Sequence, residues 1–67
     1  MYEWIPVTEM LPELNGDYIT AIQFEDGDVL VDISFWFDRS WTNPSFENVN
    51  VTHWMPLPRP PKEATNV

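Results

Sequence analysis

The stretch Asp17–Phe37, DYITAIQFEDGDVLVDISFWF, decides the fold that the sequence predicts. Two runs rich in β-branched and aromatic residues flank Asp26-Gly27, and Asp-Gly between alternating apolar residues is a strong signal for a β-hairpin. If these two residues alone form the turn, they also fix the register of the hairpin. The predicted cross-strand pairs are Phe24 with Val29, Ile22 with Val31, Thr20 with Ile33, and Tyr18 with Phe35.

This register predicts one apolar face, which we expect to be buried, and one face of mixed composition. A slip by a single residue would turn the apolar side chains of one strand outward, so the burial pattern depends on the turn. The face predicted to be buried consists of Tyr18, Ile22, Phe24, Val29, Val31, Ile33 and Phe35. The mixed face consists of Ile19, Ala21, Gln23, Leu30, Asp32, Ser34 and Trp36.

The segments on either side of the hairpin complete a small sheet. The segment 1–14 is expected to be a lid, with one helical turn at 8–11 capped by Thr8, that covers the hairpin's apolar face with Trp4, Val7 and Leu11. Trp41 either completes a short return strand or plugs one end of the core. Residues 46–54 alternate weakly and predict a third strand, in which Val49, Val51 and His53 share a face.

The sequence therefore predicts a mainly β domain, or a small α+β domain if the helical turn forms. Its centre is a three-stranded antiparallel sheet built on the hairpin at 17–37. The single domain covers 1–61 and ends in a polyproline-type tail, and residues 62–67 are expected to be a flexible C-terminal tail. With 67 residues and no cysteine, the domain must gain its stability from ten aromatic and seven proline residues.

Charge is the most informative feature of the composition. The formal net charge is −8, and residues 1–38 contain nine acidic residues and no lysine or arginine. Direct binding to nucleic acid needs cationic side chains, so this chain would be repelled by phosphates. We expect its partner to be a basic protein surface, and we expect no membrane binding, because no apolar run is long enough to span a bilayer. The expected location is a cytoplasm.

The two ends of the chain resemble a known family. The opening Trp4–Pro12, WIPVTEMLP, and the closing Val51–Pro58, VTHWMPLP, resemble the end motifs of the small phage and prophage proteins called domain of unknown function five hundred and fifty-one. Pro6 stands where that family more often has a small polar residue. The resemblance implies a phage or mobile-element origin, so the expected location becomes the host cytoplasm and the expected partner the basic surface of a host protein. It transfers no catalytic residue.

Catalysis and metal binding have weak support. His53 is the only histidine, and without a second histidine or a cysteine we expect it to lock the third strand through packing or hydrogen bonds. Asp26, Asp28 and Asp32 have a spacing that occurs in calcium loops, but they belong to the hairpin. We therefore expect no enzymatic activity and no cofactor.

The acidic side chains suggest a function. Alternate residues of a strand lie ~6.6 Å apart, close to twice the ~3.4 Å rise between phosphates of one DNA strand, so a row of acids could imitate a nucleic-acid backbone. The hypothesis is a non-enzymatic inhibitor of a host nucleic-acid-handling or defence factor, such as a CRISPR effector or a nuclease. The predicted contact residues are Glu25, Asp26, Asp28, Asp32, Trp36 and Asp38.

Four alternatives remain open at this stage. The acids can serve only as a solubilising coat, and Trp36 can be covered instead of exposed. A second function class is a small-ligand module, in which Trp36, Trp41 or Trp54 line a pocket for a nucleotide or a sugar. A third is a structural or accessory phage protein. The chain is expected to be a monomer or a weak homodimer.

Overall fold

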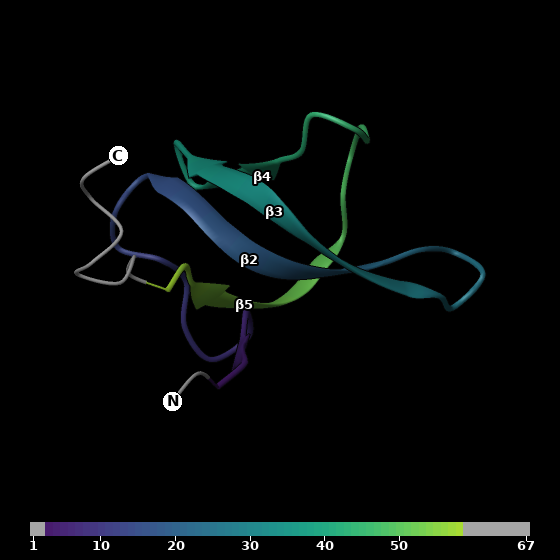
Figure 1. Cartoon of the computed structure of the whole chain (residues 1–67), viewed down its shortest axis with the longest axis horizontal. Helices are drawn as coiled ribbons and strands as arrows, with labels where there is room; N and C mark the ends of the chain where they lie inside the picture. The colour runs from purple at the N-terminus through teal and green to yellow at the C-terminus, as the bar shows by residue number, and fades with distance from the viewer. Residues whose placement is uncertain (1–2, 59–67) are drawn as a thin grey trace, which may run out of the picture.

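The described part of the chain, residues 3–58 of a computed structural model, forms one antiparallel sheet and contains no helix (Figure 1). The sheet has five strands in the order β1-β5-β2-β3-β4. The mainly β prediction is confirmed, but the sheet has two strands more than the three predicted. The strands are β1 (Ile5–Pro6), β2 (Gly16–Gln23), β3 (Val29–Phe37), β4 (Ser40–Thr42) and β5 (Val51–Pro56).

The central hairpin, β2–β3, lies where the sequence predicts it, but its register differs by one residue. Gln23 pairs with Val29 and Gly16 with Trp36, whereas the two-residue turn predicts a pair between Phe24 and Val29. The turn contains three residues, because the Phe24 amide donates to Asp28 O and the Gly27 amide donates to Phe24 O. Gly27 has a φ of 94°, which completes a type I turn followed by a left-handed residue. Asp-Gly fits both turn types, so the dipeptide did not determine the register.

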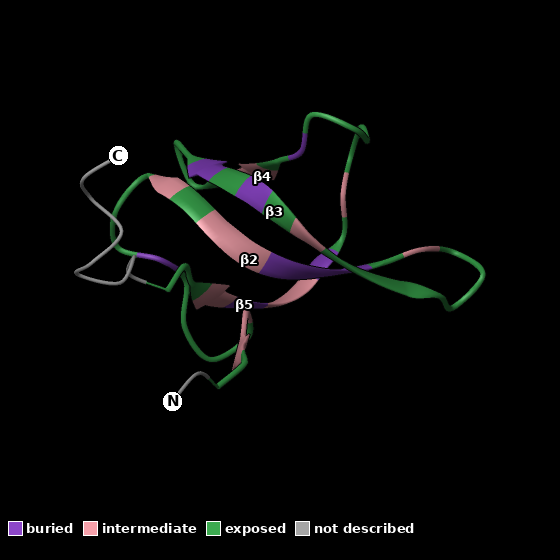
Figure 2. Ribbon diagram, in the orientation of Figure 1, coloured by how far each residue is buried: buried purple, intermediate pink, exposed green. Residues whose placement is uncertain are grey.

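The register shift exchanges the faces of β3. Its even-numbered residues lie on the inner face with Tyr18, Thr20 and Ile22, and this face is buried at Ser34 and Trp36. Its odd-numbered residues lie on the outer face. Figure 2 shows buried and exposed residues alternating along the end of β3 near β4. The predicted assignment was therefore wrong for this strand: Val29, Val31, Ile33 and Phe35 are exposed, while Ser34 and Trp36 are buried.

The second correction concerns β5, which lies between β1 and β2 and not at the edge of a three-stranded sheet. Ala21 pairs with His53 and Ile22 pairs with Val51, so Thr52 is the extra residue of a β-bulge. The bulge lets Val51 and Trp54 both face the core, and both are buried. The predicted shared face of Val51 and His53 is therefore wrong.

The N-terminal segment pairs with β5, and it contacts the hairpin where the Tyr18 hydroxyl donates to Leu14 O at 2.7 Å. β1 pairs with β5, and Pro6 O then accepts the amides of Glu9 and Met10 in a single turn that does not extend into a helix. Met10 O in turn accepts the Trp54 indole N–H at 2.8 Å. Trp4 and Leu11 remain exposed, so the predicted lid over the hairpin is not formed.

The core is a chain of aromatic rings on the inner face. The rings of Trp54 and Tyr18 meet edge-on with their centroids 5.1 Å apart, and those of Tyr18 and Trp41 meet in the same way at 6.0 Å. The centroids of Trp41 and Trp36 are 4.8 Å apart. The prediction that Trp41 completes a short return strand is confirmed, since it lies in β4. These rings supply much of the buried apolar area of a domain too small for a large aliphatic core.

Three buried polar side chains form a network beside these rings. Thr20 Oγ1 lies 2.8 Å from Ser34 Oγ, and the Asn43 amide donates to Ser34 Oγ at 3.1 Å. The Asn43 amide also donates to Ile33 O at 3.2 Å, and Thr20 Oγ1 donates to Asp32 O at 2.9 Å. Because each group has a partner, polar residues are accommodated on the buried face at low cost.

Candidate protein-binding surfaces of the hairpin

The hairpin tip brings together three of the six predicted contact residues. Glu25, Asp26 and Asp28 are exposed at the three-residue turn and its flank, and an Asp26 carboxylate oxygen accepts the Asp28 amide at 3.0 Å. The tip projects from the rest of the sheet, at the end away from β4 (Figure 1). These carboxylates therefore form a compact negative cluster that a partner can reach from several directions.

Asp32 is separated from this cluster. It lies half-buried on the inner face, where its carboxylate accepts the Ile33 amide at 2.8 Å and the Asn43 amide at 3.4 Å. Both bonds tie Asp32 to the edge of β3, which indicates a structural role for this carboxylate.

Trp36 and Asp38 are also separated from the tip. Trp36 is only 5% exposed and packs in the aromatic core, which answers the open question about its exposure. Asp38 is exposed in the turn Asp38-Arg39, whose φ values of 53° and 62° match the two-residue hairpin turn expected at the other end of β3. At ~3.4 Å per residue, β3 separates Asp38 from the tip by about 30 Å. The six predicted residues therefore do not form one continuous row.

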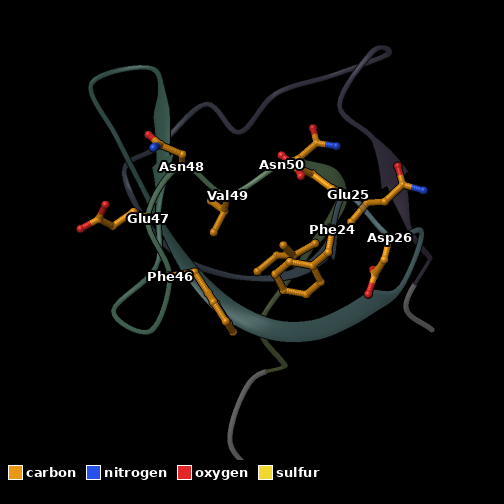
Figure 3. Close-up of a pocket in the computed structure, with 10 residues that line it drawn as sticks. Phe24, Glu25, Asp26, Phe46, Glu47, Asn48, Val49 and Asn50 are labelled. Carbon is orange, nitrogen blue, oxygen red and sulfur yellow. The ribbon is translucent and has the colours of Figure 1, made fainter.

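A groove of about 880 Å³ lies beneath the tip, on the inner side of the hairpin. Phe24 and Phe46 meet edge-on at 5.2 Å, and both line this groove. In Figure 3 the Phe24 and Val49 side chains point into the groove, while the Glu47 side chain points outward at its rim. The groove is lined by Ile22, Gln23, Phe24, Glu25, Asp26, Phe46, Glu47, Asn48, Val49 and Asn50.

An apolar floor with carboxylates at the rim suits a lysine or arginine side chain. The aliphatic stem of such a side chain can lie on the phenylalanine rings while its charge stays at the wet edge. Sequence reasoning missed this groove because it assigned Phe46–Asn50 to a strand, whereas these residues form an irregular loop before β5. The turn residues Asn43-Pro44-Ser45 were the available signal for such a loop.

The small-ligand alternative expects a pocket lined by Trp36, Trp41 or Trp54. Trp36 and Trp54 are each 5% exposed and contribute to the core. Trp41 lines a hollow of about 590 Å³ between β4 and the loop at 46–49.

The outer face of the hairpin is apolar and open to solvent. The exposed fractions along β3 are 58% for Val29, 58% for Val31, 49% for Ile33, 40% for Phe35 and 55% for Phe37. The rings of Phe35 and Phe37 stack at 6.1 Å. Ile33 pairs with Ile19, and Ile19 pairs with Met55, so the apolar surface continues across the sheet. The alternation of apolar residues in the sequence predicted such a face, but it predicted the face to be buried.

Comparison with protein families matches residues 3–62 to the family described as "Protein of unknown function (DUF551)". The chain belongs to this family. Neither the comparison with curated proteins nor that with solved structures gives a significant match. The family resemblance stated from the sequence is therefore confirmed, while the phage origin that it implies stays a prediction.

The two stretches that carry the family resemblance lie against each other in the fold. Ile5 pairs with Trp54 and Pro6 with His53 in the β1–β5 ladder, and the Val7 amide donates to Thr52 O at 3.0 Å. Since the two ends meet, the shared motifs of the DUF551 chain have a structural explanation: they close the sheet at the β1 edge.

His53 takes part in this closure. Its Nδ1 lies 2.9 Å from Thr52 Oγ1, and its ring meets Trp4 edge-on at 6.4 Å. This environment agrees with the packing and hydrogen-bonding role expected for the histidine. Within residues 3–58, no group of three or more histidine, cysteine or acidic residues is arranged to hold a metal ion, and no helix is long and apolar enough to cross a membrane.

Proposed function

We propose that this DUF551 protein is a non-enzymatic binding protein that engages the basic surface of a host nucleic-acid-handling or defence factor and inhibits it. The observation that carries the proposal is the exposed tip cluster of Glu25, Asp26 and Asp28, of which Glu25 and Asp26 line a groove that suits a cationic side chain. The acidic tip would occupy lysine and arginine residues that otherwise contact phosphates. In this proposal, the tip takes over the role that the sequence suggested for a longer row of acids.

The negative charge should accelerate association with a basic surface, but it should add little to the binding free energy. A chain with a net charge of −8 and no cation before Arg39 attracts a basic surface over a distance of about a Debye length, ~8 Å at physiological salt. Exposed ion pairs contribute only about 0.2–1 kcal/mol each, so charge mainly accelerates association and selects the partner. We therefore expect binding that weakens as salt increases.

The test uses a panel of purified host DNA-binding proteins, with labelled duplex DNA as the competitor. Wild-type protein should displace DNA from at least one member. Its direct binding to that member, measured without DNA, should weaken by about tenfold or more as the salt is raised. The double variant Asp26→Lys and Asp28→Lys should lose the competition. The control variant Glu9→Lys and Glu13→Lys makes the same change of charge at exposed residues away from the tip.

The control distinguishes a specific site from general charge. Retention of most of the competition by the Glu9 and Glu13 variant supports a contact at the tip. An equal loss in both variants would mean that net charge alone acts, and the absence of displacement at low salt for every panel member would reject the proposal. Circular dichroism verifies that both variants keep the β-sheet.

A further inference from the structure

The outer face of the β2–β3 hairpin carries a connected apolar surface that is exposed to solvent. Soluble monomers rarely expose contiguous apolar patches larger than a few hundred Å², and such patches usually mark interaction sites. Five consecutive outward-facing residues of β3 are apolar, and each is at least 40% exposed. Ile19 and Met55, both half-buried, extend this outer patch across β2 and β5.

The adjoining edge of β3 is a less suitable contact than the face. β4 covers this edge only at Phe35–Phe37, which leaves Val29–Ile33 beyond it. At Ile33, however, the Asp32 carboxylate accepts the backbone N–H and the Asn43 amide donates to the backbone C=O. An added strand would have to displace these side chains, and such capping is a known protection of sheet edges. The structure thus points to docking on the face.

Charge excludes some occupants of the face. Acids lie at its two ends, at Asp28 and at Asp38, and Asp17 lies on the face itself, opposite Phe35. A second copy would bring these carboxylates together in an isologous interface, because each chain presents the same acidic patch. An anionic membrane surface would be repelled for the same reason. A protein surface with an apolar centre and a rim of lysine or arginine matches both features.

We propose that the outer patch is the central contact for the basic protein partner, and that the partner presents an apolar surface surrounded by cationic side chains. This inference rests on the proposed function and adds the source of affinity to it. Desolvated apolar groups at the middle of an interface supply most of the binding energy, while charges at the rim control rate and selectivity. Val31, Ile33 and Phe35 lie at the middle of the patch.

The test uses two short synthetic peptides of equal length and charge, one alternating lysine with valine and the other alternating lysine with serine. The lysine–valine peptide should bind about tenfold or more tightly, which corresponds to about 1.4 kcal/mol. The variant Val31→Thr and Phe35→Thr should reduce this preference to about threefold or less and retain the sheet in circular dichroism. Fluorescence anisotropy of labelled peptides gives the dissociation constants.

The outcomes separate the two proposals. If both peptides bind equally to the wild type and the Asp26→Lys and Asp28→Lys variant binds neither, the tip alone is the contact and the outer-patch inference is overturned. If neither peptide binds at low salt, the proposed function fails together with the inference. A wild-type dimer in sedimentation velocity that the Val31→Thr and Phe35→Thr variant lacks would assign the patch to a second copy and overturn the inference.

Discussion

The inner face of the β2–β3 hairpin buries polar residues, whereas its outer face exposes apolar ones. The inner face buries Thr20, Ser34 and Trp36, whereas the outer face leaves Val31 and Ile33 in solvent. Polar residues are tolerated inside because each hydroxyl and amide has a partner, and a residue's hydrophobicity alone does not decide its burial. The contrast indicates that the inner face stabilises the fold and that the outer face is available for function.

The largest expected difference between the faces is at their aromatic residues. Trp36→Ala removes a ring packed 4.8 Å from Trp41 and should reduce the free energy of unfolding by about 3–5 kcal/mol. Phe37→Ala, the neighbour on the outer face, should cost about 1 kcal/mol or less, because Phe37 is mostly exposed. Urea denaturation followed by circular dichroism measures both. Similar costs would contradict the assignment of the faces.

The polar network gives the next largest effect. Ser34→Ala removes the hydroxyl that forms hydrogen bonds with Thr20 Oγ1 and with the Asn43 amide. The substitution should reduce the free energy of unfolding by about 1–3 kcal/mol. Ser45→Ala is the control, since the Ser45 side chain is exposed, and should change stability by about 0.5 kcal/mol or less. The same denaturation experiment applies. A neutral Ser34→Ala would contradict a stabilising role for the hydrogen bonds of Ser34.

Replacing a valine by threonine on each face of the sheet tests the comparison further. Val51→Thr places a hydroxyl in the core beside Ile22 and should cost at least about 1 kcal/mol. Val31→Thr places it in solvent on a strand, where threonine is well tolerated, and should cost about 0.5 kcal/mol or less. Thermal unfolding of the two variants under identical conditions provides the measurement, and a reversed order would reject the observed register.

The smallest effect is expected at the turn. Deleting Glu25 leaves Asp26-Gly27 as a two-residue turn between Phe24 and Asp28, which already pair, so the strand register can stay unchanged. Stability should therefore change by about 1 kcal/mol or less. Amide exchange of the β2 and β3 backbone identifies the pairs. A large loss of stability would show that the turn, and not the inner face, maintains the register.

The sequence predicted the position of the hairpin and its turn because Asp-Gly between β-rich runs is a local signal. The same signal could not decide between a two-residue and a three-residue turn, so the predicted faces of β3 were exchanged. The three exposed acids at the tip were predicted correctly as surface residues, whereas Asp32 and Trp36 turn inward with their strand. The groove at Phe24 and Phe46 joins residues far apart in the chain, which no local pattern reports.

The sequence by itself determined a β-rich chain, the place of its central turn, its strong negative charge and its family. Only the tertiary structure decided which face of β3 is buried and which strands flank β2. The reason is that side-chain period in a strand is two residues, so one extra residue in a turn reverses a whole face. The packing of Trp36 on Trp41 and the hydrogen bonds of Ser34 select between the two registers, and both depend on segments that follow the hairpin.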